Sequence, residues 1–191
     1  SVHSELSMST NNKFIDGKIL SGRVYPEFFS FEKTHSVLNI GCGYGPQAIA
    51  YEGYYQQMVG VDITLTRLVE SLELQKSIPM GNYIPLMGDV EILPIAGATF
   101  DRAIAIDIIE HVRSPEKMLQ EIRRTLKDDG QVLITFPTLH DKYTAAISWF
   151  ARNVLRRQSK GTFQDSSQEW HPDNHNQEYP VDEWISLVES F

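Results

Sequence analysis

The chain has 191 residues, of which 41% are hydrophobic and 22% are charged, a composition typical of one soluble globular domain. Its formal net charge of −8 disfavours a general nucleic-acid binder, whose surface would be basic. Cys42 is the single cysteine, which excludes an intramolecular disulfide and a cysteine-built zinc site. No stretch approaches the roughly 20 apolar residues that form a transmembrane segment. These features predict a cytoplasmic protein.

Residues 1–31 are predicted to form an amino-terminal arm, polar as far as residue 12, followed by a helical cap. After them, short apolar runs alternate with segments of helical periodicity. The predicted strands are residues 37–40, 58–61, 83–87, 102–106 and 132–136, and the predicted helices are residues 46–55, 65–76, 115–126 and 181–191. Asp129 and Gly130 are predicted to form the turn before the fifth strand.

Two of these helices show their apolar residues at helical spacing. They are Leu65, Leu68, Val69 and Leu72 in the first, and Met118, Leu119, Ile122 and Leu126 in the second. Strands that alternate with helices predict parallel βαβ units with right-handed crossovers, and short all-apolar strands are typical of a sheet covered on both faces. The expected fold is a Rossmann-like, doubly wound α/β sheet, mostly parallel, with residues 32–137 as its core and 138–191 as a loop and last helix of the same domain.

A strand ending at Ile40 runs into three alternate glycines, Gly41, Gly43 and Gly45. Glycine permits the positive φ angles of a tight turn and lets a ligand lie against the backbone. Asp62 lies 62 − 41 = 21 residues after the first glycine, at the end of the second strand. A carboxylate there is placed to accept hydrogen bonds from both ribose hydroxyls of a nucleotide. The dinucleotide fingerprint requires a glycine where this chain has Pro46, which disfavours a nicotinamide cofactor.

Five segments in order resemble the motifs of class I S-adenosylmethionine (SAM)-dependent methyltransferases. They are residues 39–45, 60–63, 88–94 with 100–101, 106–112 and 126–131. The resemblance extends from about residue 37 to about residue 137. It departs from the family at Asn39, where an acidic residue is usual.

The resemblance implies SAM as the cofactor and assigns roles to individual residues. Asp62 accepts the ribose hydroxyls, Ile63 packs on the adenine, Asp89 accepts a hydrogen bond from the adenine amino group, and the Val90 amide contacts a ring nitrogen. The implied cofactor-binding residues are Asn39, Gly41, Cys42, Gly43, Gly45, Asp62, Ile63, Asp89, Val90 and Asp107. The family also implies two further strands after residue 191.

Asp107 and His111 are the candidate catalytic residues. Asp107 holds the polar end of the cofactor or of the substrate, or it caps a helix. His111 contacts the substrate, abstracts a proton, or bonds only locally. Methyl transfer needs chiefly the alignment of the nucleophile, the methyl carbon and the sulfur, and it needs a general base only when the nucleophile must lose a proton. The expected acceptor is a small molecule.

Three histidines are candidates for the substrate side: His140, His171 and His175. A metal site at His171, Asp173 and His175 is an alternative, although Pro172 favours a turn over the extended backbone that would align the three side chains. No metal is therefore expected.

A basic amphipathic stretch, residues 145–160, is expected to contact lipid, to cover an apolar substrate or to pack on its own domain. Two other functions stay open for the whole chain. One is an NAD-dependent oxidoreductase, and the other is a non-catalytic SAM-fold binding protein, which Asn39 alone suggests.

Overall fold

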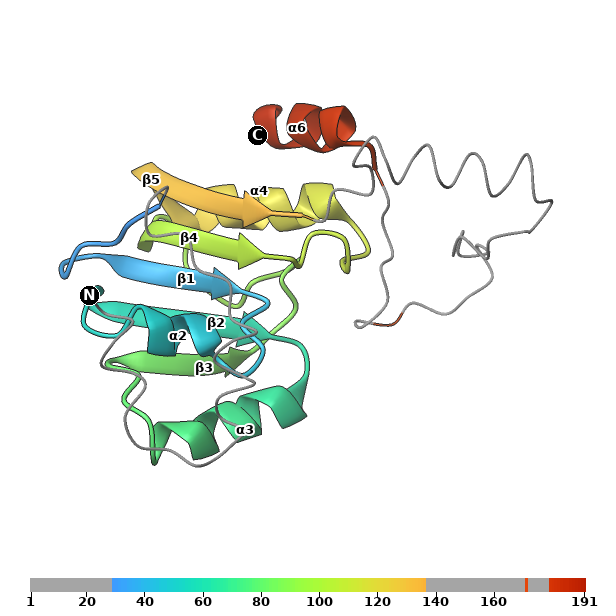
Figure 1. Ribbon diagram of the computed structural model, residues 1–191. Coiled ribbons are helices and arrows are strands. Elements are labelled where there is room, and N and C mark those ends of the chain that lie inside the picture. The colour runs from blue at the N-terminus through green and yellow to red at the C-terminus, as the bar shows by residue number, and fades with distance from the viewer. Residues whose placement is uncertain (1–28, 137–170, 172–178) are drawn as a thin grey trace, which may run out of the picture.

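The computed structural model of the chain describes residues 29–136, 171 and 179–191. The predicted arm and most of the helical cap, the basic stretch, His140 and His175 lie outside these residues. The helices and strands are β1 (Ser36–Ile40), α2 (Pro46–Ala50), β2 (Gln57–Asp62), α3 (Leu65–Gln75), β3 (Tyr83–Met87), β4 (Phe100–Ile106), α4 (Pro115–Thr125), β5 (Leu126–Thr135) and α6 (Val181–Glu189) (Figure 1). Within the described residues no helix is both long and apolar enough to cross a lipid bilayer.

The described strands form one parallel sheet in the order β3-β2-β1-β4-β5. In the central strand, Val37 pairs with Met58 of β2 on one side and with Arg102 of β4 on the other. After β1, the chain therefore adds β2 and β3 on one side of it, and then crosses to the other side to add β4 and β5. This topology confirms the doubly wound α/β fold, and it places a topological switch point between the carboxyl ends of β1 and β4.

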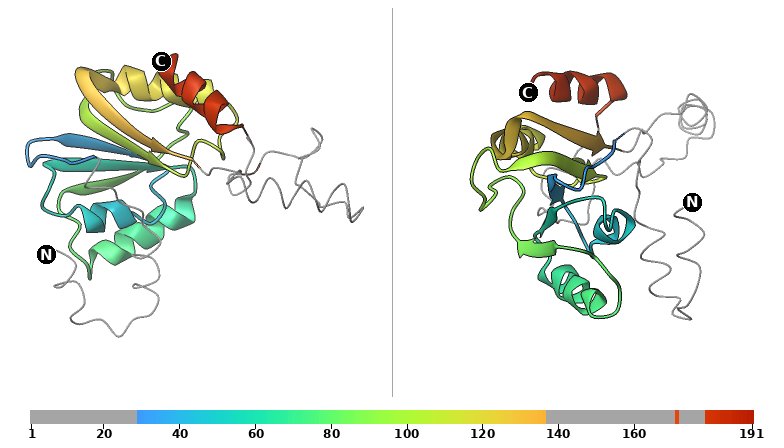
Figure 2. Two further views of the ribbon diagram at one scale, coloured as in Figure 1. Left: turned by 45° about the horizontal axis from the view of Figure 1, so that its top comes forward. Right: turned by 90° about the vertical axis from the view of Figure 1, so that its left-hand side faces the viewer.

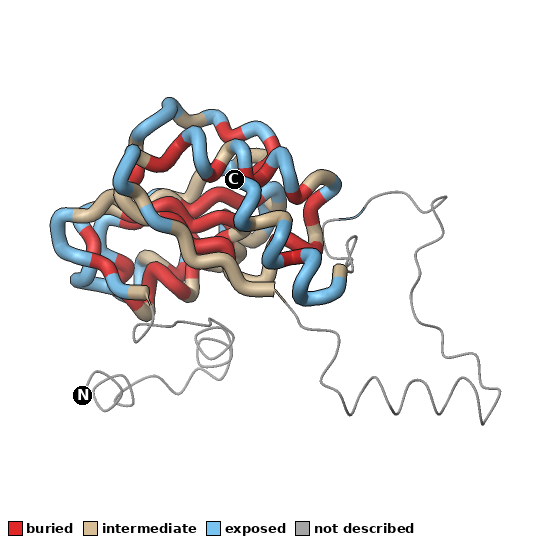
Figure 3. Tube along the Cα trace, turned by 90° about the horizontal axis from the view of Figure 1, so that it is seen from above, coloured by how far each residue is buried: buried red, intermediate tan, exposed pale blue. Residues whose placement is uncertain are grey.

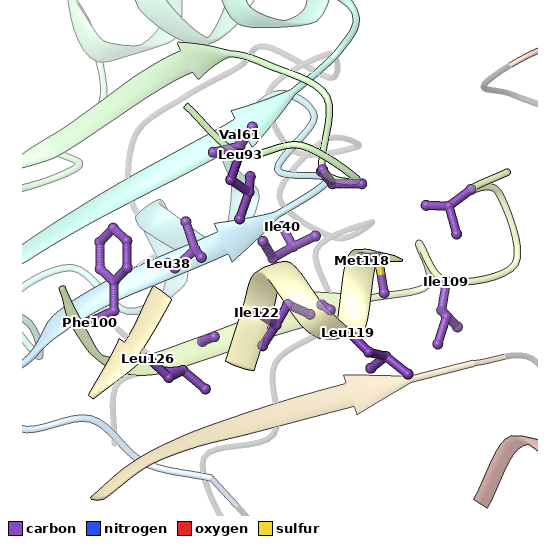
Figure 4. Packing of buried hydrophobic residues seen from close by; sticks show 14 of the residues in the cluster. Leu38, Ile40, Val61, Leu93, Phe100, Ile109, Met118, Leu119, Ile122 and Leu126 are labelled. Carbon is purple, nitrogen blue, oxygen red and sulfur yellow. The ribbon is translucent and has the colours of Figure 1, made fainter. Parts of the chain in front are cut away.

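Helices cover both faces of the sheet, so each face has its own hydrophobic core. Leu38 and Ile40 of β1 belong to the core under α4 and α6 (Figure 4), whereas Val37 of the same strand belongs to the core under α2 and α3. The alternation follows from the period of two along a strand. Figure 2 shows α2 and α4 on opposite sides of the sheet, and Figure 3 shows the strands as the most deeply buried part of the chain. This two-sided burial explains why the strands are short and apolar.

Two of the predicted helices differ from the structure. The helix predicted over residues 46–55 ends at Ala50, and Gly53 then adopts a left-handed φ of 78°. In α3 only one of the four apolar residues at helical spacing is buried. Leu68 is buried together with Ser71 and Leu74, whereas Leu65, Val69 and Leu72 are exposed. Helical spacing identified the helix but not which of its faces meets the sheet.

The turn predicted at Asp129 and Gly130 lies within the bounds of the fifth strand rather than before it, because a Cβ atom on Gly130 would lie 3.0 Å from the Leu126 Cβ. β5 begins at Leu126 and includes both residues. Its pairing with β4 shifts register, because Phe100 pairs with Leu126 but Arg102 pairs with Gln131. The extra residues of β5 between these two pairs form an irregularity within the strand, which contains the predicted turn.

The predicted last helix is confirmed as α6. Trp184 is 2% exposed and packs with Phe136, at a ring-centroid distance of 5.6 Å, and with Tyr179. Leu187 and Val188 are partly buried against the core under α4. Helical spacing would place Phe191 on the same face, but it is 41% exposed because it follows the helix and no longer keeps its periodicity.

Candidate functional site

The glycine turn lies at the carboxyl end of β1, beside the switch point of the sheet. Gly41, Gly43 and Gly45 have φ angles of 66°, 53° and 81°, all left-handed. The turn is attached to β2 by a backbone hydrogen bond from the Cys42 amide to the Val61 carbonyl (3.0 Å). Gly41 also approaches the chain that follows β4, where a Cβ atom would lie 2.6 Å from the Ile108 side chain. The turn requires glycine for its backbone and, at Gly41, for space as well.

Asp62 connects the glycine turn to the start of α3. Its Oδ2 accepts a hydrogen bond from the Gly43 amide (2.9 Å), and its Oδ1 accepts one from the Thr64 amide (2.8 Å). The residue is 5% exposed. Two backbone donors therefore fix the orientation of this carboxylate, which keeps further lone pairs for a ligand.

A pocket that is partly open to solvent lies at this edge of the sheet. The pocket is lined by Gly41, Asp62, Ile63, Thr64, Arg67, Asp89, Val90, Glu91, Ile108, His111 and Val112. Five of the predicted cofactor residues are thus brought together with the candidate catalytic histidine. Asn39, Cys42, Gly43, Gly45 and Asp107 are not in the pocket wall.

Asn39 lies behind the turn rather than in the pocket. It is 1% exposed, and its Nδ2 donates to Oε1 of Gln47 in α2 (3.4 Å). The side chain that departs from the family motif therefore connects β1 to the first helix. Its contact with Gln47 indicates a structural role in holding the turn.

Cys42 is also buried, at 2% exposure. Burial raises the pKa of its thiol to about 12, an effect that proximity to Tyr83 offsets only in part. The thiol stays protonated at neutral pH and is a poor nucleophile. The Tyr83 ring packs beneath the turn so closely that a Cβ atom on Gly45 would lie 3.0 Å from it. Cys42 and Tyr83 support the turn by packing.

Asp89 and Glu91 follow β3 and are joined to Arg113, which precedes α4. Asp89 Oδ1 accepts a hydrogen bond from the Glu91 amide (2.9 Å), and its Oδ2 accepts one from the Arg113 guanidinium. Glu91 Oε1 accepts from the Arg113 backbone amide (2.7 Å) and from its Nε (3.3 Å). Burial alone would lower the pKa of Arg113, but its bonds to Glu91 and the charge of Asp89 hold it above its usual value.

Asp107 directly follows β4 and has a left-handed conformation with a φ of 49°, which is unusual for a residue other than glycine. Thr135 of β5 holds it in two ways. The Thr135 Oγ1 accepts from the Asp107 amide (3.0 Å) and donates to Asp107 Oδ1 (2.9 Å). Thr135 was missed by the sequence analysis, although its position at the end of the fifth strand, paired with Ile106, was the available signal.

His111 lies in the pocket wall, with its side chain 20% exposed. Its Nε2 is 3.8 Å from Oε1 of Glu110, a carboxylate that is only 3% exposed. Its backbone amide donates to the Ile108 carbonyl (2.9 Å), so the segment forms a turn that directs the histidine to the pocket. Of the three substrate-side histidines, the structure describes only His171, which is exposed.

Comparisons with known proteins agree with this geometry. A family model described as a methyltransferase domain matches residues 38–134. The chain belongs to this methyltransferase family. The match confirms the resemblance to class I SAM-dependent methyltransferases and assigns SAM as the cofactor.

Among individual relatives, an uncharacterized methyltransferase, YcgJ of Bacillus subtilis, is 31% identical over 52% of this chain and 40% of its own length. The (S)-coclaurine N-methyltransferase of Papaver somniferum is 26% identical over 58% of this chain and 32% of its own length. The malonyl-[acyl-carrier protein] O-methyltransferase of Erwinia pyrifoliae is 30% identical over 59% and 41%. The crystal structure of YcgJ has a TM-score of 0.64 at 23% identity, covering 92% of this chain and 67% of that one, and so supports the fold. The chain spans about 40% of the length of the first curated relatives it matches.

The described residues fit the cofactor of this methyltransferase family. The Thr64 Oγ1 is buried in the pocket wall with no hydrogen-bond partner among the described residues. The space beside Gly43 is open, because a Cβ atom there would meet nothing within 4 Å. Carboxylates at Asp62 and Asp89 supply acceptors for hydroxyl and amino groups. Sequence analysis did not identify Thr64, Arg67, Glu91, Ile108 or Val112 as part of this wall.

Proposed function

We propose that this chain transfers a methyl group from SAM to a small-molecule acceptor and acts in the cytoplasm. The observation that carries the proposal is the placement of Asp62. Two backbone amides fix its carboxylate beside the glycine turn, in a pocket at the switch point of the sheet. The net charge of −8 supports a partner other than nucleic acid.

In this proposal Asp62 accepts the ribose hydroxyls and Ile63 packs on the adenine. Asp89 accepts a hydrogen bond from the adenine amino group, and the Val90 amide donates to a ring nitrogen. The turn has no side chains at Gly41, Gly43 and Gly45, so the methionine part of SAM can lie against its backbone. Cys42 and Asn39 support the turn from behind. The support is that Asp62, Ile63, Asp89 and Val90 line one pocket.

Bound SAM supplies an activated methyl group, so the protein chiefly has to align the acceptor with it. We propose that Asp107, held by Thr135, positions the polar end of the cofactor or of the acceptor. We propose that His111 contacts the acceptor and accepts its proton when the nucleophile is a hydroxyl. The relatives include an N- and an O-methyltransferase. We therefore propose a small-molecule acceptor and do not assign the atom that receives the methyl group.

Titration calorimetry tests the proposal with two ligands. S-adenosylhomocysteine (SAH) is expected to bind with a dissociation constant on the order of micromolar, and NAD is expected to give no heat of binding. The reason is that Pro46 and the spacing of the glycines do not fit the dinucleotide fingerprint. Binding of NAD without binding of SAH would favour the oxidoreductase alternative.

The same titration locates His111 relative to the cofactor. Since we place it on the acceptor side, the His111→Ala variant is expected to bind SAH within about twofold of the wild type, the range of substitutions that remove no ligand contact. A loss of affinity as large as that of an Asp62 variant would instead place His111 in the cofactor site.

A further inference from the structure

Arg113 joins two connections of the fold that are far apart in the sequence. Asp89 and Glu91 belong to the connection after β3, whereas Arg113 belongs to the connection between β4 and α4. Asp89 and Glu91 both line the pocket, and Arg113 directly follows another lining residue, Val112. The arginine therefore lies behind the pocket wall at the end proposed to hold adenine.

Glu91 holds the Arg113 side chain in position. Its side chain is 6% exposed, and a carboxylate so deeply buried requires charged or hydrogen-bonded partners. The Arg113 backbone amide and Nε both supply them at Oε1. The arginine side chain is thus held in one place although it is 48% exposed.

In this position the Arg113 guanidinium donates a hydrogen bond to Asp89 Oδ2, while Asp89 Oδ1 accepts one from the Glu91 amide. Both oxygens of Asp89 therefore have a donor, and these two donors set the plane of the carboxylate. An ionised carboxylate accepts hydrogen bonds and cannot donate one.

We propose that Arg113 is a positioning residue that holds the Asp89 carboxylate in the orientation in which it accepts from a purine amino group, and so makes the pocket selective for 6-aminopurine over 6-oxopurine ligands. An acceptor pairs with the amino group of an adenosyl ligand, whereas it repels the carbonyl oxygen of an inosyl ligand. Without the guanidinium, the Asp89 carboxylate is free to rotate away from the adenine amino group, and the discrimination falls. This inference rests on the proposed function, since it deepens the role given to Asp89.

The test compares the affinities of SAH and of its deaminated counterpart, S-inosylhomocysteine, by calorimetry. The variant is Arg113→Met, which removes the donors, keeps much of the side-chain length and preserves the backbone amide that bonds to Glu91. We expect about a tenfold loss of SAH affinity, the scale of one charge-assisted hydrogen bond, with little change for the inosyl ligand. The Arg113→Lys variant, which keeps a point charge, is expected to show a smaller loss in the same direction.

Arg124→Met is the matched control, because Arg124 bonds to a carboxylate, Glu121, and to the carbonyls of Leu93 and Ile95 outside the pocket. It is expected to leave the ratio of the two affinities unchanged. In an Asp89→Asn background, Arg113→Met is expected to have no further effect on that ratio.

An adenosyl-to-inosyl ratio in Arg113→Met equal to that of the wild type would overturn the inference, as would an equal weakening of both ligands. If Arg113→Met does not fold, the same criterion applies to Arg113→Lys. Failure of the wild type to bind SAH would contradict the proposed function instead, so the two failures are distinguishable.

Discussion

Replacing Asp62 with asparagine is expected to lower the affinity for SAH by about 10- to 100-fold, the equivalent of roughly 1.5–3 kcal/mol for hydrogen bonds to a charged group. Each carboxylate oxygen accepts a backbone amide, from Gly43 at 2.9 Å and from Thr64 at 2.8 Å. An amide side chain has one acceptor oxygen, so its NH₂ group must face one of these donors. The variant therefore disturbs the glycine turn or the start of α3, and it also weakens the acceptor for the ribose. Calorimetric titration measures the change.

Asp101→Asn is the matched control at the opposite edge of the sheet. Asp101 also uses both oxygens, accepting from the Ser36 amide (2.8 Å) and from Lys127 Nζ (2.7 Å). Burial would raise the pKa of Asp101, but these two donors hold it below its usual value. The control is expected to lose stability and to keep its affinity for SAH. Equal affinities of Asp62→Asn and the wild type would sink the ribose assignment.

Replacing Gly41 with alanine is expected to lower the free energy of unfolding by about 2–5 kcal/mol. Of this, about 1–2 kcal/mol comes from placing alanine in a left-handed conformation, here at a φ of 66°. A further 1–3 kcal/mol, roughly, comes from overpacking, because the added Cβ would lie 2.6 Å from Ile108 Cγ1 and 3.0 Å from its Cβ. Isoleucine is branched at Cβ and has few alternative rotamers. Chemical denaturation measures the loss.

Gly43→Ala separates the two contributions. Gly43 has a similar φ of 53°, but a Cβ there would meet nothing within 4 Å. Its cost is expected to be about 1–2 kcal/mol, from the backbone alone. Equal losses in the two variants would show that the contact between Gly41 and Ile108 is not tight.

Much of the fold was predictable because its signals are local. The first four predicted strand segments are short and apolar and are followed by Gly or Asp, and both ends of β3 were predicted to the residue. The glycine turn and Asp62 were predictable as a pair because their spacing reflects one βαβ unit. The structure adds that the two are joined directly, through the Gly43 amide.

Contacts between distant connections were not predictable. Arg113 meets Asp89 across 24 residues, and Thr135 meets Asp107 across 28, and no periodicity links such pairs. Helical spacing alone did not tell which face of α3 meets the sheet, because tertiary packing makes that choice, burying Leu68 and exposing Leu65. The motif position of Asn39 suggested a ligand contact, whereas its bond to Gln47 turns it away from the pocket wall.

The central claim is that the pocket at the switch point holds SAM by its carboxylates. A crystal structure of the chain grown with SAH tests it most directly. We expect the ribose hydroxyls within hydrogen-bond distance of the Asp62 carboxylate, and the adenine beside Ile63 with its amino group facing Asp89. Density for the ligand at any other surface, with Asp62 bonded only to the Gly43 and Thr64 amides, would contradict it.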